Sequence, residues 1–338
     1  MSEAKPKTSE KTESFDSAGD TAGSHGFAGR TSRFLEEMLK KKPGDTDELC
    51  PGSYEELHKK CKDVFPMVWD GLRIMLNKGL SNHFQVQHTV SMSTMSTGYR
   101  FGATYVGHRL VGPGEAYPIM LGEMDMDGNS QATVVHTFGD KLKCKVQAQT
   151  QKGTLVGTQG SAEFKGRLSH CSLTVANLDP LHHSGLYVTQ LMRRVWSRLD
   201  VGAELMYQYG PNVPREHFSM LSLAARYQLD GGGTLSATAG EHTLQLCYHR
   251  KQRDNLQLAV EWETNFRQRE SQAQIGYQVD LNEKHGLQFK AALDSNWNVT
   301  ATMEKRLSQD MPITLALSAM LNHTKSQCRA GIGLVIGG

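Results

Sequence analysis

Alternating apolar and polar residues fill segments of about ten residues that run from Asp70 to the end of the chain. Successive side chains of a β-strand point to opposite faces, so this alternation gives each strand one apolar and one polar face. In the second segment, Phe84 and Val86 lie on one face, while Gln85 and Gln87 lie on the other. Strands with one lipid face and one polar face are typical of membrane barrels. The pattern predicts an all-β fold, a transmembrane β-barrel.

The region from Asp70 onward holds about 19 segments, each with a membrane strand of about 9–11 residues and a short turn. Turn residues mark several boundaries, among them residues 125–129, 210–214 and 230–233. The predicted strands begin near residues 70, 82, 98, 115, 129, 141, 154, 167, 184, 198, 217, 234, 243, 256, 270, 286, 297, 313 and 326. An odd number of strands requires the first and last to pair in parallel when the barrel closes.

A soluble β-sandwich or propeller also consists of many short strands and is the structural alternative. The chain has no repeat of about 40–50 residues, which a propeller requires. A helical membrane span is excluded, because no stretch approaches about 18 consecutive apolar residues. The mean hydropathy of -0.47 suits a barrel in which half of each strand faces water. The barrel is therefore the better prediction.

The region before the strands divides into a tail and a helical segment. Residues 1–30 are polar and rich in Gly and Ser, which predicts a disordered tail. Residues 31–69 are predicted to be helical, with a short helix over 33–42 and a second that starts at Ser53. In the second, Ser53 and Glu56 form a capping box, and the apolar residues at helical spacing before Pro66 are Tyr54, Leu57, Cys61 and Val64.

Two interpretations of this second helix stand side by side. Its Lys59, Lys60 and Lys62 favour the helix macrodipole, so the cluster is consistent with an ordinary surface helix. The alternative is that the amphipathic segment lies inside the barrel and narrows or supports the lumen. Residues 70–338 form one continuous domain in either case, since no linker divides them.

Composition excludes several classes of function. The 37 basic and 35 acidic residues are spread along the chain and leave a net charge of +2, which argues against a nucleic-acid partner. The six cysteines are far apart and lack a C-x-x-C pair, so we predict reduced thiols and no metal site. No nucleophile elbow, Walker loop or G-x-G-x-x-G motif is present. We therefore predict neither an enzyme nor a cofactor.

The N-terminus carries no apolar stretch of the kind found in secretory signal peptides. A barrel without such a signal argues against a bacterial outer-membrane protein. We therefore predict a multi-pass protein of the mitochondrial outer membrane.

The face opposite the apolar stripe carries charges that must meet water, because a charge on the lipid face near mid-membrane costs about 2–4 kcal/mol. Its acidic residues are Glu163, Glu204, Glu261, Glu263, Asp280, Asp294 and Glu304, and its basic residues are Arg73, Arg100, Lys143, Lys145, Lys165, Arg226, His249 and Lys290. These charges either simply solvate a pore or, in the later strands, attract basic unfolded segments through weak, reversible contacts.

Several longer motifs resemble a known family. Residues 51–58 (PGSYEELH), 77–86 (NKGLSNHFQV), 101–107 (FGATYVG) and 276–281 (GYQVDL) resemble the channel-forming subunit of the translocase of the outer mitochondrial membrane. Shorter strings at 294–297 and 321–323 match the same family. The resemblance extends from about residue 50 to the end of the chain.

The resemblance implies a 19-stranded barrel of the mitochondrial porin superfamily with an N-terminal helical segment in the lumen. It implies that the substrates are unfolded precursor proteins, and that the partners are receptor subunits, small single-span subunits and a second copy of the barrel. It also implies that the last strand carries a membrane-insertion signal, which in this chain consists of Arg329, Gly331, Leu334 and Ile336.

The predicted function is a protein-conducting channel that imports presequence-bearing precursors. Basic presequences would meet the lumen carboxylates Glu204, Glu261, Glu263, Asp280, Asp294 and Glu304. The alternatives are a metabolite or anion porin of the same membrane and a non-conducting scaffold for translocase subunits.

Overall fold

The structure is a computed structural model that describes residues 50–94, 97–112, 115–139, 141–179, 184–211, 216–282, 286–308 and 312–337. The predicted tail over 1–30 and the predicted helix over 33–42 lie outside the described residues, so the proposed domain boundaries stay a prediction. Among the described residues, no helix has the length and apolar character needed to cross a membrane.

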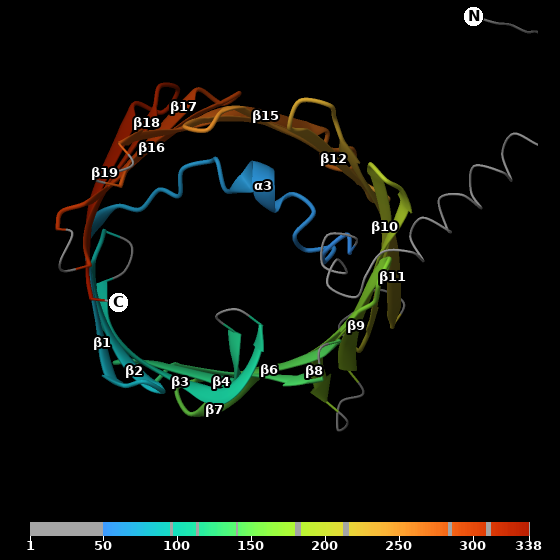
Figure 1. The fold of residues 1–338 in the computed structure, drawn as a ribbon, viewed down its shortest axis with the longest axis horizontal. Coiled ribbons are helices and arrows are strands. Elements are labelled where there is room, and N and C mark those ends of the chain that lie inside the picture. The colour runs from blue at the N-terminus through green and yellow to red at the C-terminus, as the bar shows by residue number, and fades with distance from the viewer. Residues whose placement is uncertain are drawn as a thin grey trace, which may run out of the picture. The chain divides into compact units, whose positions relative to one another are not determined.

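In the part of the chain that the structure describes, nineteen strands form one closed sheet. Figure 1 shows this sheet in a view along the barrel. The strands are β1 (Gly71–Ser81), β2 (Phe84–Met92), β3 (Thr97–Gly112), β4 (Glu115–Asp125), β5 (Ser130–Phe138), β6 (Leu142–Gln151), β7 (Thr154–Lys165), β8 (Ser169–Asp179), β9 (Ser184–Trp196), β10 (Leu199–Tyr209), β11 (His217–Gln228), β12 (Gly233–Ala239), β13 (Thr243–Arg253), β14 (Leu256–Asn265), β15 (Glu270–Asn282), β16 (Leu287–Asp294), β17 (Asn298–Arg306), β18 (Ile313–Asn322) and β19 (Gln327–Ile336). Each begins within two residues of its predicted start. The predicted barrel and its strand count are confirmed.

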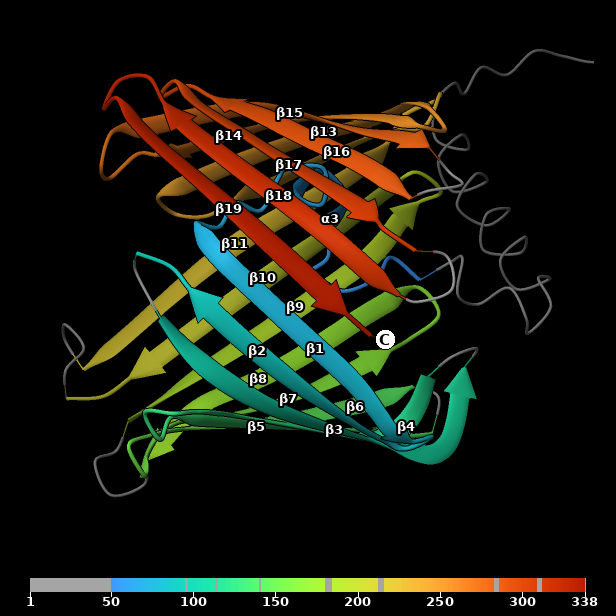
Figure 2. The same ribbon diagram turned by 90° about the vertical axis from the view of Figure 1, so that its left-hand side faces the viewer.

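Every neighbouring pair along the chain is antiparallel, and β1 closes the barrel by pairing in parallel with β19. In this pairing Gly71 lies opposite Gly331, and Leu76 lies opposite Ile336. Figure 2 shows β1 beside β19, with the strands inclined to the barrel axis. The parallel closure predicted from an odd strand number is therefore confirmed.

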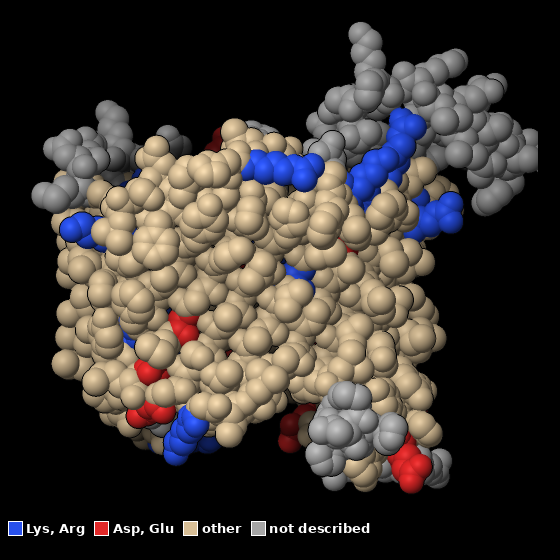
Figure 3. Space-filling model, turned by 90° about the horizontal axis from the view of Figure 1, so that it is seen from below, with Lys and Arg blue, Asp and Glu red and all other residues tan. Residues whose placement is uncertain are grey.

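The outer wall is apolar, because the alternating aliphatic and aromatic residues of each strand point outward. Leu223, Ile275 and Ile332 are examples, each 50–60% exposed. Figure 3 shows one side of this wall, around β2–β7, with few charged side chains and most of them near the two edges. Such a band is what a barrel presents to lipid.

Aromatic residues gather where the outer wall meets one rim. The rings of Tyr187, Tyr207, Tyr209 and His217 stack across β9, β10 and β11, with centroids 6.1–6.2 Å apart. The Tyr207 hydroxyl lies 3.0 Å from the His217 ring nitrogen. Aromatic rings with a polar tip favour the membrane–water interface, so this cluster marks one edge of the lipid band.

The predicted helix from Ser53 to Pro66 is much shorter in the structure. Only α3 (Lys59–Lys62) is α-helical, with His58 as its N-cap. The Ser53 hydroxyl accepts a hydrogen bond from the Glu56 N–H at 3.3 Å, so one half of the predicted capping box forms. The other turns of the segment close mostly by bonds between residues three apart, which do not propagate an α-helix. The capping signal was therefore correct and the predicted length was wrong.

Candidate functional site

Residues 51–69, here called the N-terminal segment, lie inside the barrel and identify the lumen face of each strand. Figure 1 shows α3 within the ring of strands, close to the wall formed by the later strands. The segment contacts one face of the sheet at Ser236, Cys247 and Ser318. Directly opposed residues of paired strands point to the same face of the sheet. The strand register therefore identifies the lumen-facing side chains of every other strand around the barrel.

A buried charge cluster holds the first end of the segment. Asp200 of β10 is 1% exposed and forms ion pairs with Arg194 at 2.8 Å and Arg226 at 2.6 Å. The Arg226 guanidinium also donates a hydrogen bond to the carbonyl oxygen of Pro51. The start of the N-terminal segment is therefore fixed to β11 through a guanidinium that Asp200 neutralises.

The predicted apolar residues of the segment form two small cores with the lumen wall. Leu57 packs with Met192 and Ala224, and Tyr54 lies against them. Cys61 and Val64 pack with Cys247 and Ala259, and Phe65 lies against this second core. All four predicted residues, Tyr54, Leu57, Cys61 and Val64, therefore face the wall, and the interpretation that the segment lies inside the barrel is confirmed.

Polar contacts between these cores fix the register of the segment. The two ring nitrogens of His58 lie 2.8 Å from the Ser236 hydroxyl and 2.7 Å from the Thr238 hydroxyl. The Cys61 thiol donates to the carbonyl oxygen of Val260 at 3.5 Å. Short hydroxyl side chains on β12 thus let the segment lie close to the sheet.

The other end of the segment crosses the later strands to the closing pair. The Lys290 ammonium donates to the Asp63 carbonyl oxygen at 2.7 Å. Trp69 lies against Gly331 of β19, where an added Cβ atom would sit 2.4 Å from the Trp69 carbonyl oxygen and 2.7 Å from its ring. Any side chain at position 331 would therefore collide with the end of the segment.

The pKa of Tyr54 is raised to about 12, first by burial and then by the negative charge of Glu204. Its hydroxyl is buried and has no hydrogen-bond partner among the described residues. Tyr54 is therefore neutral and acts through packing against the lumen wall.

The structure places all six predicted carboxylates on the lumen face. Glu261 is 8% exposed beneath the N-terminal segment, and its two oxygens accept hydrogen bonds from Gln245 and Gln274. A passing chain cannot reach this carboxylate without displacing these partners. Glu261 is therefore less accessible to a passing chain than the other five predicted carboxylates.

Glu263 and Glu304 are exposed, whereas Glu204, Asp280 and Asp294 are half-buried. The last three each accept a hydrogen bond from a glutamine on a neighbouring strand, and the pairs are Gln190–Glu204 at 2.7 Å, Gln288–Asp280 at 3.0 Å and Gln272–Asp294 at 2.9 Å. These hydrogen bonds fix the direction in which each carboxylate points. The later strands therefore present oriented negative charges to the lumen.

Several lumen charges were not among the predicted residues. Asp200, Arg194, Glu123 and Asp125 all belong to the polar face. The alternation of β10 places Asp200 on the same face as Glu204, so the sequence held the signal for its orientation. Nothing in the sequence indicates that Arg194 and Arg226 both converge on it.

The residues of the predicted insertion signal fall on both faces of β19. Arg329 and Gly331 share the lumen face, whereas Leu334 and Ile336 share the lipid face. Their role as an insertion signal stays a prediction.

The described residues include no group of three His, Cys, Asp or Glu side chains arranged to hold a metal ion. All six cysteines lie in the described ranges, and each is a free thiol there.

Asp70 caps the turn that follows β2, and its hydrogen bonds predict a pH effect. Its carboxylate accepts hydrogen bonds from Thr94 and Ser93, which lower its pKa from 3.8. A lowered pKa stabilises the folded state above the unfolded pKa, and this contribution is lost as the pH falls through the folded pKa. We expect Asp70→Asn to lower the thermal midpoint at pH 6, with the difference from the parent protein shrinking below about pH 4.

Thermal unfolding of both proteins in detergent, monitored by circular dichroism between pH 6 and pH 3, measures this effect. Asp254→Asn, at an exposed turn, serves as the control. A pH-independent difference for Asp70→Asn would show that its carboxylate charge makes no contribution.

Known proteins similar to this chain are eukaryotic porins and mitochondrial import receptor subunits. The eukaryotic porin family matches residues 50–333 of this chain. The chain is 51% identical over 287 residues to the mitochondrial import receptor subunit TOM40 homolog of Caenorhabditis elegans, covering 85% of this chain and 94% of that protein. It is 44% identical over 312 residues to the TOM40 homolog 2 of Drosophila melanogaster, covering 92% and 91%. It is 41% identical over 288 residues to the human TOM40 homolog, covering 85% and 78%.

Proposed function

Since this chain belongs to the eukaryotic porin family and its relatives are import receptor subunits of mitochondria, we propose that it is a protein-conducting channel of the outer mitochondrial membrane. Its substrates are unfolded precursor proteins with basic, amphipathic presequences. The observation that carries this proposal is a closed barrel with an apolar outer wall and oriented carboxylates on its polar lumen face. Its strands cross the membrane, and conduction requires no covalent chemistry.

The carboxylates available to a passing presequence are Glu204, Glu263, Asp280, Asp294 and Glu304. Their spread over β10 and β14–β17 offers several weak contacts in place of one tight site. Conduction requires that binding be strong enough for entry and weak enough for exit. Several single charges in water meet this requirement better than one buried site, because each attraction is screened within about 8–10 Å.

The N-terminal segment supports the wall that carries these carboxylates. It lies across strands from β11 to β19 and occupies part of the lumen. We propose that it narrows the route and keeps the translocating chain close to the carboxylates.

The two alternative functions are not favoured. The relatives of known name are import receptor subunits, and a lumen wall that presents carboxylates favours basic polypeptide segments over the anions that a metabolite porin conducts. Receptor subunits, small single-span subunits and a second copy of the barrel are proposed as partners.

Single-channel recording of the reconstituted full chain tests the proposal. We expect voltage-dependent block by a basic amphipathic presequence peptide, and no block by a scrambled or acidic peptide of equal length. A wide, anion-preferring channel that ignores all three peptides would favour the metabolite porin. Folded protein without conductance would favour the scaffold.

A further inference from the structure

Glutamines line the lumen face on both sides of the barrel, and several of those on the later strands are paired with carboxylates. From β9 onward, Gln190, Gln245, Gln272, Gln274 and Gln288 each donate a hydrogen bond to a carboxylate. Each of these amides therefore has one donor already engaged within the protein. They lie on or beside what we here call the acidic wall, the lumen face of β10 and β14–β17 that carries the six predicted carboxylates.

The early strands carry glutamines of a different kind. Gln131 of β5, Gln147 and Gln149 of β6, and Gln159 of β7 are exposed or half-buried, and their carboxamides make no hydrogen bond to any described residue. Gln131 lies directly opposite Gln149, and Gln147 lies directly opposite Gln159. We call these four residues the amide face.

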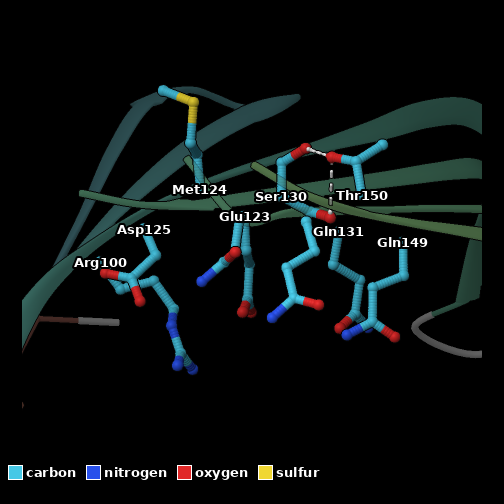
Figure 4. A pocket seen from close by; sticks show the side chains of 10 residues that line it. Arg100, Glu123, Met124, Asp125, Ser130, Gln131, Gln149 and Thr150 are labelled. Carbon is cyan, nitrogen blue, oxygen red and sulfur yellow. Dashed lines mark hydrogen bonds between the residues drawn. The ribbon is translucent and has the colours of Figure 1, made fainter. Parts of the chain in front are cut away.

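The amide face borders two open spaces of the lumen. Gln131 and Gln149 line a hollow of about 290 Å³ together with Arg100 and Glu123. Figure 4 shows these four side chains pointing to one side of the sheet, whereas Met124 and Thr150 point to the other. Gln159 lines a smaller cavity of about 60 Å³ that separates β6–β9 from the start of the N-terminal segment.

Charge at the borders of the amide face is balanced in sign. Three acidic residues, Glu123, Asp125 and Glu163, and three basic residues, Arg100, Lys143 and Lys145, lie around it on the lumen face. The glutamines between them are neutral. This part of the lumen therefore favours neither basic nor acidic segments of a polypeptide in transit, which we call the guest chain.

The chemistry of the amide face matches the polypeptide main chain. A carboxamide carries both donors and an acceptor, as does each peptide group. Side chains two residues apart on a strand, such as Gln147 and Gln149, are separated by about 6.6–6.8 Å, which is also the repeat of an extended guest chain. Such contacts depend on the backbone of the guest and not on its side chains.

We propose that the amide face binds the main chain of extended, uncharged stretches of the polypeptide in transit. This inference rests on the proposed protein-conducting function and adds a second class of contact to it. The acidic wall binds basic presequences, and the amide face binds neutral segments that follow them. Each contact exchanges one hydrogen bond to water for one to the guest, so the binding is weak and reversible.

The test compares two double variants with the same chemical change. Gln147→Ala with Gln149→Ala removes two amides of the amide face, and Gln85→Ala with Gln87→Ala removes two unpaired lumen amides at the same spacing on β2. The probe is a 20-residue peptide of Gly, Ser and Asn, whose blocking events are timed in single-channel recordings of the full chain. We expect residence to shorten by at least about threefold for the β6 variant, because two hydrogen bonds are lost, and to stay unchanged for the β2 variant.

The outcomes separate this inference from the proposed function. Equal residence times in the β6 variant and the parent protein would overturn the inference, and so would an equal shortening in both variants. Block by a basic presequence peptide is measured in the same membranes and is expected to persist in both variants. Its absence from the parent protein would contradict the proposed function, whatever the glutamine variants show.

Discussion

Replacing Asp200 by alanine is expected to lower the free energy of unfolding by about 3–5 kcal/mol, because it leaves two buried guanidinium groups without a counter-charge. Asp200 is the shared partner of Arg194 and Arg226, whose side chains are 11% and 12% exposed. Arg226 in turn holds the Pro51 carbonyl oxygen. The variant should therefore also release the start of the N-terminal segment from the lumen wall.

Urea unfolding in detergent, followed by tryptophan fluorescence, measures the loss of stability, and limited proteolysis near Pro51 measures the release. Asp230→Ala is the matched control, because Asp230 pairs with Arg198 at 2.7 Å but both side chains are exposed. An exposed pair contributes about 0–1 kcal/mol. Equal losses for the two variants would show that burial of the Asp200 cluster has no energetic consequence.

Reversing the charge of three accessible lumen carboxylates is expected to abolish most of the affinity for a presequence. In the triple variant Glu263→Lys, Asp280→Lys and Glu304→Lys, each substitution replaces an attraction by a repulsion. At about 4 Å in water each interaction is worth about 1 kcal/mol. The loss of the three attractions alone, about 3 kcal/mol in total, corresponds to a roughly 100-fold rise in the half-blocking concentration of a basic peptide at low salt, and the added repulsions raise that concentration further.

The control reverses the same number of charges at exposed turns, in Asp230→Lys, Glu241→Lys and Asp254→Lys. It matches the change in net charge without altering the lumen wall. The difference between the two variants should shrink as salt is raised, because screening weakens exposed charges. An equal rise in both would show that the lumen position of the carboxylates is irrelevant to block.

The barrel was predictable because its determinants are local. A period of two places every other residue on the lipid face, and turn residues end each strand, so the alternation fixes both the strand starts and the lumen face. The odd strand count then fixes the parallel closure of β1 with β19. The lumen placement of Glu263, Asp280 and Lys290 followed from the same alternation.

The contacts between the segment and the wall were not predictable, because they depend on residues far apart in the chain. The predicted helix from Ser53 is cut to α3, since Leu57 packs into one core on the wall, whereas Cys61 and Phe65 pack into another. Tertiary packing thus overrides helical spacing. The same packing covers Glu261, whose sequence pattern is indistinguishable from that of the accessible Glu263.

The pairing of β1 with β19 determines when this protein can finish folding. The two strands stand at opposite ends of the described chain, so their union has the largest loop-closure entropy of any pairing in the sheet. Until β19 is available, β1 and β18 both expose unpaired backbone edges, which invite association with other chains. Lipid hydrocarbon cannot form hydrogen bonds with the unpaired N–H and C=O groups of these edges, so an incomplete sheet is energetically costly in the bilayer. We therefore expect closure to be the slow, final step of assembly, and the chain to require protection from aggregation until its last ten or so residues have joined the sheet.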